Sequence, residues 1–160
     1  MIQLTVITVG NLKEGYWCEA VAEYEKRLRA FCKPTVLQLK EARLSDNPSE
    51  GEIRAALADE GRRILDAIPP RSYSIALCVE GRQFSSEELA ARLESVLSTE
   101  SGSLCLVIGS SHGLAEEVKA ACQLRLSVSK LTFPHQLMRP LLLEILYRSF
   151  SIIKGTKYHK

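Results

Sequence analysis

Short runs rich in apolar and β-branched residues recur along the chain, and longer segments with helical periodicity lie between them. This alternation is typical of an α/β domain with a mainly parallel sheet, because parallel strands are joined by helical crossovers. The predicted strands are Ile2–Val9, Thr35–Lys40, Tyr73–Val79, Ser103–Gly109 and Leu124–Ser129.

The segments between these strands predict helices, and some of them have clear ends. Ser85 and Glu88 form a capping box, so a helix is expected to begin there. Pro69 and Pro70 end the helix before it, because proline cannot continue the backbone hydrogen bonds. The predicted helices are 14–31, 49–68, 85–97, a short one after residue 115, and a last one from about 134 to near 154.

The chain of 160 residues is most simply one domain, 1–160, with no internal repeat. Its hydrophobic fraction of 46% and charged fraction of 25% are ordinary for a soluble protein. No apolar run approaches the roughly 20 residues of a membrane span, so no membrane partner is expected. The opening stretch MIQLTVITVG has neither a basic leader nor a cleavage site, and a cytoplasmic location is expected.

Several common kinds of site are disfavoured. The five cysteines are widely spaced without a CxxC pair, and the three histidines lack local ligand spacing, so no metal is expected. The absence of GxGxxG and GxxxxGK[ST] argues against a Rossmann dinucleotide site and a P-loop. Ser111 and His112 are adjacent, but without a GxSxG elbow or an acid partner they do not indicate a hydrolase.

Charge is distributed unevenly along the chain. Residues 1–118 contain 13 Lys and Arg against 18 Asp and Glu, whereas residues 119–160 contain 8 against 1. A one-sided basic surface is typical of proteins with a phosphate-bearing partner. A solvated basic face without such a partner is an equally good interpretation of charge alone.

Three predicted strands are followed by unusual sequence: VEGRQFSSEE, IGSSHGLAEE and SKLTFPHQLMR. Ligands of parallel sheets bind beyond the C-terminal ends of the strands. Gly81, Gly109 and Gly113 permit close approach of a ligand to the backbone, although each also fits an ordinary tight turn.

The start of the last helix combines a histidine and an arginine. The spacing of four between His135 and Arg139 puts both on one helix face, where they suit a phosphate or a developing anion. The alternative is that His135 caps the helix and Arg139 makes a surface contact. Because Pro140 disfavours helical geometry at Arg139, the helix is expected to start late or to bend.

The last helix, LLLEILYRSFSIIK, is apolar around most of its circumference. A helix of this kind has to be buried on more than one side. One side is expected to be the sheet and the other a second copy of the chain, which predicts a homodimer through this helix.

Several stretches together closely resemble the RlmH (YbeA) family of SPOUT-class RNA methyltransferases: VIGSSHGL, LTFPHQLMR, LLEILYRSF, VGNLKEGYW, EYEKRL and the terminal YHK. The resemblance covers essentially the full length, in the same order. It implies the SPOUT (α/β-knot) fold, in which the C-terminal segment forms a deep trefoil knot, and a homodimer across the last helix.

The resemblance also implies a cofactor and a reaction. The family uses S-adenosyl-L-methionine to methylate N3 of a pseudouridine in helix 69 of the large-subunit ribosomal RNA, within the assembled ribosome. Contacts with the cofactor are mostly main-chain and apolar, and Ser110 stands where a second glycine is expected after Gly109. The implied cofactor-binding residues are Leu77, Gly109 and the knotted loop of Val128, Ser129, Lys130, Leu131, Thr132 and Phe133.

The implied chemistry is attack of a ring nitrogen on the sulfonium methyl, and that nitrogen must first lose its proton. We hypothesise that His135 or His159 assists this deprotonation, that Arg139 stabilises the anionic ring or a phosphate, and that Tyr158 abuts the target nucleotide. The tail of Tyr158, His159 and Lys160 follows the predicted dimer helix directly, so a site shared between two subunits is expected. The alternatives are a non-catalytic RNA-binding or ribosome-binding protein with this fold, and a SPOUT enzyme with another RNA target.

Overall fold

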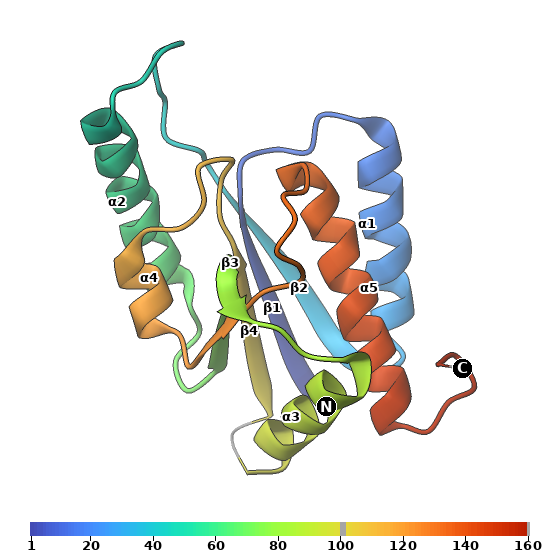
Figure 1. Cartoon of the computed structure of the whole chain (residues 1–160). Helices are drawn as coiled ribbons and strands as arrows, with labels where there is room; N and C mark the ends of the chain where they lie inside the picture. The colour runs from blue at the N-terminus through green and yellow to red at the C-terminus, as the bar shows by residue number, and fades with distance from the viewer. Residues whose placement is uncertain (100–101, 160) are drawn as a thin grey trace.

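The computed structural model describes residues 1–99 and 102–159, and it has the predicted α/β architecture (Figure 1). Its strands form one parallel sheet in the order β2-β1-β4-β3-β5. They are β1 (Ile2–Val9), β2 (Cys32–Leu39), β3 (Tyr73–Arg82), β4 (Ser103–Ile108) and β5 (Leu124–Leu126).

Helices cover both faces of the sheet, with α1, α3 and α5 on one face and α2 and α4 on the other (Figure 1). In β4, Leu104 and Leu106 belong to the core on the side of α1, α3 and α5, whereas Cys105 and Val107 belong to the core on the side of α2 and α4. Burial on both faces explains why the strands have continuous apolar sequences. The helices are α1 (Gly15–Leu28), α2 (Glu50–Ala67), α3 (Ser86–Thr99), α4 (Glu116–Ala121) and α5 (His135–Ile153).

The predicted helix signals are confirmed. The backbone amide of Glu88 donates to Ser85 Oγ at 3.1 Å, and the backbone amide of Ser85 donates to Glu88 Oε2 at 2.7 Å. These two bonds are the capping box expected at the start of α3. Helix α2 ends at Ala67, just before Pro69 and Pro70.

Three predicted strand boundaries are wrong by three residues each, including the end of β3, which lies at Arg82 and not at Val79. Strand β2 begins at Cys32 and includes Pro34. Proline has no backbone donor, but it is tolerated here because β2 lies at the edge of the sheet. Strand β5 ends at Leu126, three residues early. The backbone amide of Ser127 donates to the carbonyl of Arg82, and β3 has a register shift between Leu77 and Arg82.

Helix α5 begins at His135 and continues through Pro140, so the expected late start is wrong. Proline at this position removes the backbone donor that would otherwise bond the carbonyl of Gln136, which is a single hydrogen bond near the helix start. Helix α5 contacts both α1 and α3 (Figure 1). Much of its apolar circumference is therefore covered within one chain, and the homodimer stays a prediction.

Arg139 ties α5 to the ends of two strands. Arg139 is only 4% exposed, so the alternative in which it makes a surface contact is wrong. The guanidinium donates to Gln38 Oε1 at 3.0 Å, to the carbonyl of Val9 at 3.3 Å and to the carbonyl of Gly10. Burial lowers the pKa of Arg139 below its ordinary value. Arg139 thus holds the end of β1 against the first turns of α5.

The cysteines carry no disulfide. Cys32 and Cys105 are buried, and burial raises the pKa of both thiols to about 12. Within residues 1–99 and 102–159, no three His, Cys, Asp or Glu side chains come together as a metal-binding group. Over the same residues, no helix combines the length and apolar character needed to cross a bilayer.

Replacing Arg139 should destabilise the fold. Arg139→Met leaves the buried carbonyls of Val9 and Gly10 without their side-chain donor, and we expect the free energy of unfolding to fall by about 2 kcal/mol. Arg54→Met, on the exposed face of α2, is the matched control and should change it by less than about 0.5 kcal/mol. Urea unfolding of the two variants measures the difference, and equal stabilities would contradict this role for Arg139.

Candidate functional site

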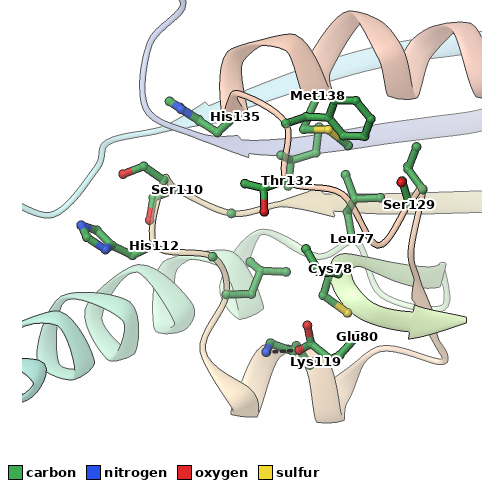
Figure 2. A pocket seen from close by; sticks show the side chains of 18 of the residues that line it. Leu77, Cys78, Glu80, Ser110, His112, Lys119, Ser129, Thr132, His135 and Met138 are labelled. Carbon is green, nitrogen blue, oxygen red and sulfur yellow. Dashed lines mark hydrogen bonds and ion pairs between the residues drawn. The ribbon is translucent and has the colours of Figure 1, made fainter.

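A cavity of about 370 Å³ lies at the C-terminal ends of β3 and β4 (Figure 2). Three segments form most of its wall: the second half of β3 (77–80), the turn after β4 (109–114) and the segment before α5 (128–133). Helix α4 adds Lys119, and α5 adds His135 and Met138. We call this the first cavity. Residues from all three of the unusual stretches that follow predicted strands line this cavity.

Most residues that the resemblance assigned to the cofactor line this cavity. Lys130 is the exception, since it lines a smaller hollow beside Val79, Glu80, Gly81 and Gln83. The residues of this set in the first cavity are Leu77, Gly109, Val128, Ser129, Leu131, Thr132 and Phe133.

The turn after β4 is built around close backbone approach. A Cβ on Gly109 would lie 2.2 Å from the carbonyl oxygen of Gly113, so no side chain fits at this position. Gly113 has a φ of +91°, which favours glycine, and its amide donates to the carbonyl of Ser110 at 2.9 Å. Ser110 itself does not need a positive φ, so the expected second glycine is not required here.

Apolar and charged groups occupy different parts of the first cavity. Leu77, Phe133 and Met138 provide apolar surface, which suits a flat heteroaromatic ring. On the rim, Lys119 donates to Glu80, and this hydrogen bond lowers the pKa of Glu80 and raises that of Lys119 (Figure 2). The two residues are 39 positions apart, so no local sequence signal could have shown the pair.

Cys78 is another lining residue that sequence reasoning missed, because its apolar neighbours indicated a fully buried strand position. The thiol is half-buried in β3 and faces the cavity (Figure 2). Burial raises the pKa of Cys78, so the thiol is protonated at neutral pH and not a strong nucleophile.

His135 lies at the edge of the first cavity, on the opposite side from Leu77 and Cys78 (Figure 2). Its Nε2 is buried and has no hydrogen-bond partner among the residues that the structure describes. Burial lowers the pKa of His135, and Arg139 and Lys13 act in the same direction, while Glu41 opposes them. The imidazole is therefore neutral at pH 7 and able to accept a proton.

The predicted catalytic residues are not brought together within one chain. Arg139 is buried below the first turn of α5 and does not line the first cavity. Tyr158 and His159 contact Glu144 and Arg148, which follow His135 in α5 by nine and thirteen residues. These positions are about 14 and 20 Å from His135 along the helix axis.

The tail is held against the C-terminal half of α5. The hydroxyl of Tyr158 donates to Glu144 Oε2 at 2.9 Å, and the guanidinium of Arg148 lies 4.8 Å from the centre of its ring. His159 Nε2 is 2.8 Å from Glu87 Oε1 on α3. The prediction for Lys160 falls outside the described residues.

Known proteins resemble this chain over nearly its whole length. Residues 2–159 match the family described as "Predicted SPOUT methyltransferase". A relative from Leuconostoc mesenteroides is 43% identical over 99% of this chain and 100% of its own length, and one from Moorella thermoacetica is 44% identical over 100% of both. Each of the two is named "Ribosomal RNA large subunit methyltransferase H".

A solved structure supports the fold independently. The probable methylase family protein from Haemophilus influenzae Rd KW20 aligns with 100% of this chain and 72% of its own, with a TM-score of 0.55 at 14% identity. At this identity the likeness concerns the fold alone. The family match and the two relatives lead to one conclusion: the chain belongs to the SPOUT methyltransferase family.

Proposed function

We propose that this protein transfers a methyl group from S-adenosyl-L-methionine to N3 of a pseudouridine in helix 69 of the large-subunit ribosomal RNA, in the assembled ribosome. The family supports the methyl transfer, and the names of the two relatives support the large ribosomal subunit as the source of the RNA. The observation that carries the proposal is the first cavity, in which residues implied to bind the cofactor converge from three separate segments of the chain.

The first cavity fits this cofactor in size and chemistry. Its volume of about 370 Å³ is typical of small-molecule sites. Leu77, Leu131 and Phe133 would hold the adenosine part by apolar contact, and the Glu80 and Lys119 pair could meet polar groups at the rim. The cofactor, when bound, supplies an electrophilic methyl group. The wall of the cavity orients it and limits the access of water.

His135 is our candidate for the group that takes the proton from the target nitrogen. It lines the first cavity, its imidazole is neutral, and its buried Nε2 lacks a partner among the described residues. Arg139 acts as a positioning residue in this scheme, because its guanidinium is already engaged by Gln38 and by the carbonyls of Val9 and Gly10. It fixes the end of β1 close to His135.

We also propose a homodimer through α5, in which the tail of one subunit completes the first cavity of the other. Within one chain, Tyr158 and His159 contact Glu144 and Arg148, away from His135 at the first residue of α5. Leu137, Leu141 and Ile152 are half-buried along one stripe of α5 and would face the partner. The trefoil knot implied by the resemblance belongs to the same proposal.

The central experiment is the transfer of labelled methyl from S-adenosyl-L-methionine to ribosomes that lack this modification. We expect incorporation into the large-subunit RNA, at the helix 69 pseudouridine when the labelled nucleotide is mapped. Incorporation at another nucleotide would indicate a SPOUT enzyme with a different target. Calorimetry with the cofactor tests the non-catalytic alternative, which predicts no binding.

The pH dependence of the rate should reflect His135. Because its pKa is lowered, the neutral imidazole predominates above about pH 6.5. Single-turnover rates are expected to fall only below that pH, as the protonated form accumulates. His135→Gln should reduce the rate roughly 100-fold or more and remove this acidic fall. A variant with the wild-type rate and profile, and with unchanged cofactor affinity, would exclude His135 as the base.

Mixed dimers test whether the site is shared. We expect His135→Ala and His159→Ala each to lose most activity as homodimers. After subunit exchange at equal concentrations, about half of the dimers carry one of each variant and have one intact shared site, so about a quarter of the wild-type rate should return. If the tail acted within its own chain, no mixture would recover activity. Size-exclusion chromatography with light scattering verifies the dimer.

A further inference from the structure

A second cavity, of about 600 Å³, adjoins the first. We call it the second cavity. The two cavities share Ser111 and His135, so these two residues stand at the boundary between them. The rest of its wall comes from the loop after β1 and from the end of β2, with Gln136 from α5: Gly10, Asn11, Lys13, Gln38, Leu39, Lys40 and Glu41.

The second cavity differs chemically from the first. Its wall is mostly polar, with the side-chain amides of Asn11, Gln38 and Gln136, and it carries two lysines. Lys13 and Lys40 are exposed, and neither forms an ion pair within residues 1–99 and 102–159. Amide groups suit the edges of a base or a ribose, and lysine ammonium groups suit phosphates.

The wall of the second cavity is held in place before any ligand arrives. The backbone amide of Lys13 donates to Gln136 Oε1 at 3.0 Å, and Gln38 Nε2 donates to Asn11 Oδ1 at 2.5 Å. Gly10 has a φ of +86°, and a Cβ there would lie 3.1 Å from Glu41 Oε2. A fixed wall reduces the ordering cost of binding, as a specific site requires.

Glu41 is the one acidic side chain in this wall, and its negative charge disfavours an anionic group of the ligand next to it. Its carboxylate lies beside Gly10, and its charge raises the pKa of His135 against the larger effect of burial. A phosphate is therefore expected at Lys13 and Lys40 and away from Glu41. The position next to His135 is left for an uncharged ring with an N–H group.

We infer that the second cavity receives the target nucleotide of the RNA after it has turned out of its helix, with its phosphate at Lys13 and Lys40 and its base beside His135 and Ser111. This inference rests on the proposed function and names the substrate-binding part of that site. A nucleotide has to leave its stack for a ring nitrogen to reach a methyl donor, so the site needs a polar chamber next to the cofactor. The second cavity is such a chamber.

The test replaces the two lysines together, as Lys13→Gln with Lys40→Gln. Lys13 lies just before α1 and Lys40 just after β2, and the matched control is Lys26→Gln with Lys33→Gln, because these exposed lysines lie at the opposite ends of the same two elements. Both double variants lose the same charge. The measurements are KM for unmodified ribosomes at several salt concentrations and the affinity for S-adenosyl-L-methionine by calorimetry.

We expect the Lys13 and Lys40 variant to raise KM for ribosomes roughly tenfold, and to reduce the slope of log affinity against log salt by about 2, with unchanged cofactor affinity. The control variant should resemble the wild type. Equal KM values for the two double variants would overturn the inference. A loss of cofactor affinity in the Lys13 and Lys40 variant would also overturn it, because the lysines would then serve the first cavity.

Failure of the proposed function gives a different result, since the wild type would then methylate no RNA. In that case, binding of uridine 5′-monophosphate is followed by NMR at the side-chain amides of Asn11, Gln38 and Gln136. Shifts in the wild type that disappear in the Lys13 and Lys40 variant support a nucleotide site in the second cavity. Absent shifts, or shifts that persist in the variant, overturn it.

Discussion

The contact of Arg139 with the end of β1 joins the start of α5 to the edge of the sheet beside the second cavity. One buried guanidinium donates to the carbonyls of Val9 and Gly10 and to Gln38, so α5, β1 and β2 are joined at one point. His135 is one helical turn before Arg139, and the wall of the second cavity begins at Gly10. Removing a charged guanidinium from water costs free energy, and its hydrogen bonds to the neutral oxygens of Gln38, Val9 and Gly10 offset that cost only while all of them are formed. The start of α5 and the ends of β1 and β2 are therefore held rigidly against one another.

The candidate site has two adjoining cavities with different chemistry. The first cavity has apolar side chains and close backbone approach at Gly109, which suit an adenosine-containing cofactor. The second cavity has amides and lysines, which suit a nucleotide of RNA. His135 belongs to both, with a neutral imidazole because burial lowers its pKa. In the proposed function, His135 is the proton acceptor between the methyl donor and the target that methylation of an imide nitrogen needs.

Helix α5 links this site to the tail, since it carries His135 at its first residue and is followed by Tyr158 and His159. The ion pair of Glu144 and Arg148 holds the tail on the outer stripe of the helix. This stripe is where we place the second subunit. A rigid helix fixes the distance between the two groups, so a single chain keeps them apart, and an antiparallel partner would bring them together.

The sequence by itself determined the order of helices and strands, the capping box of α3 and the three strand-end loops, because all of these depend on periodicity or on residues within one turn of each other. The resemblance added the cofactor and the reaction. Only the tertiary structure decided that Arg139 is buried, that Lys119 pairs with Glu80, and that the loop after β1 forms a chamber beside His135. The partners of Arg139 on β1 are 129 and 130 residues away in the chain, and the partner of Lys119 is 39 away. Contacts over such separations arise from the packing of the elements, so no local pattern specifies them.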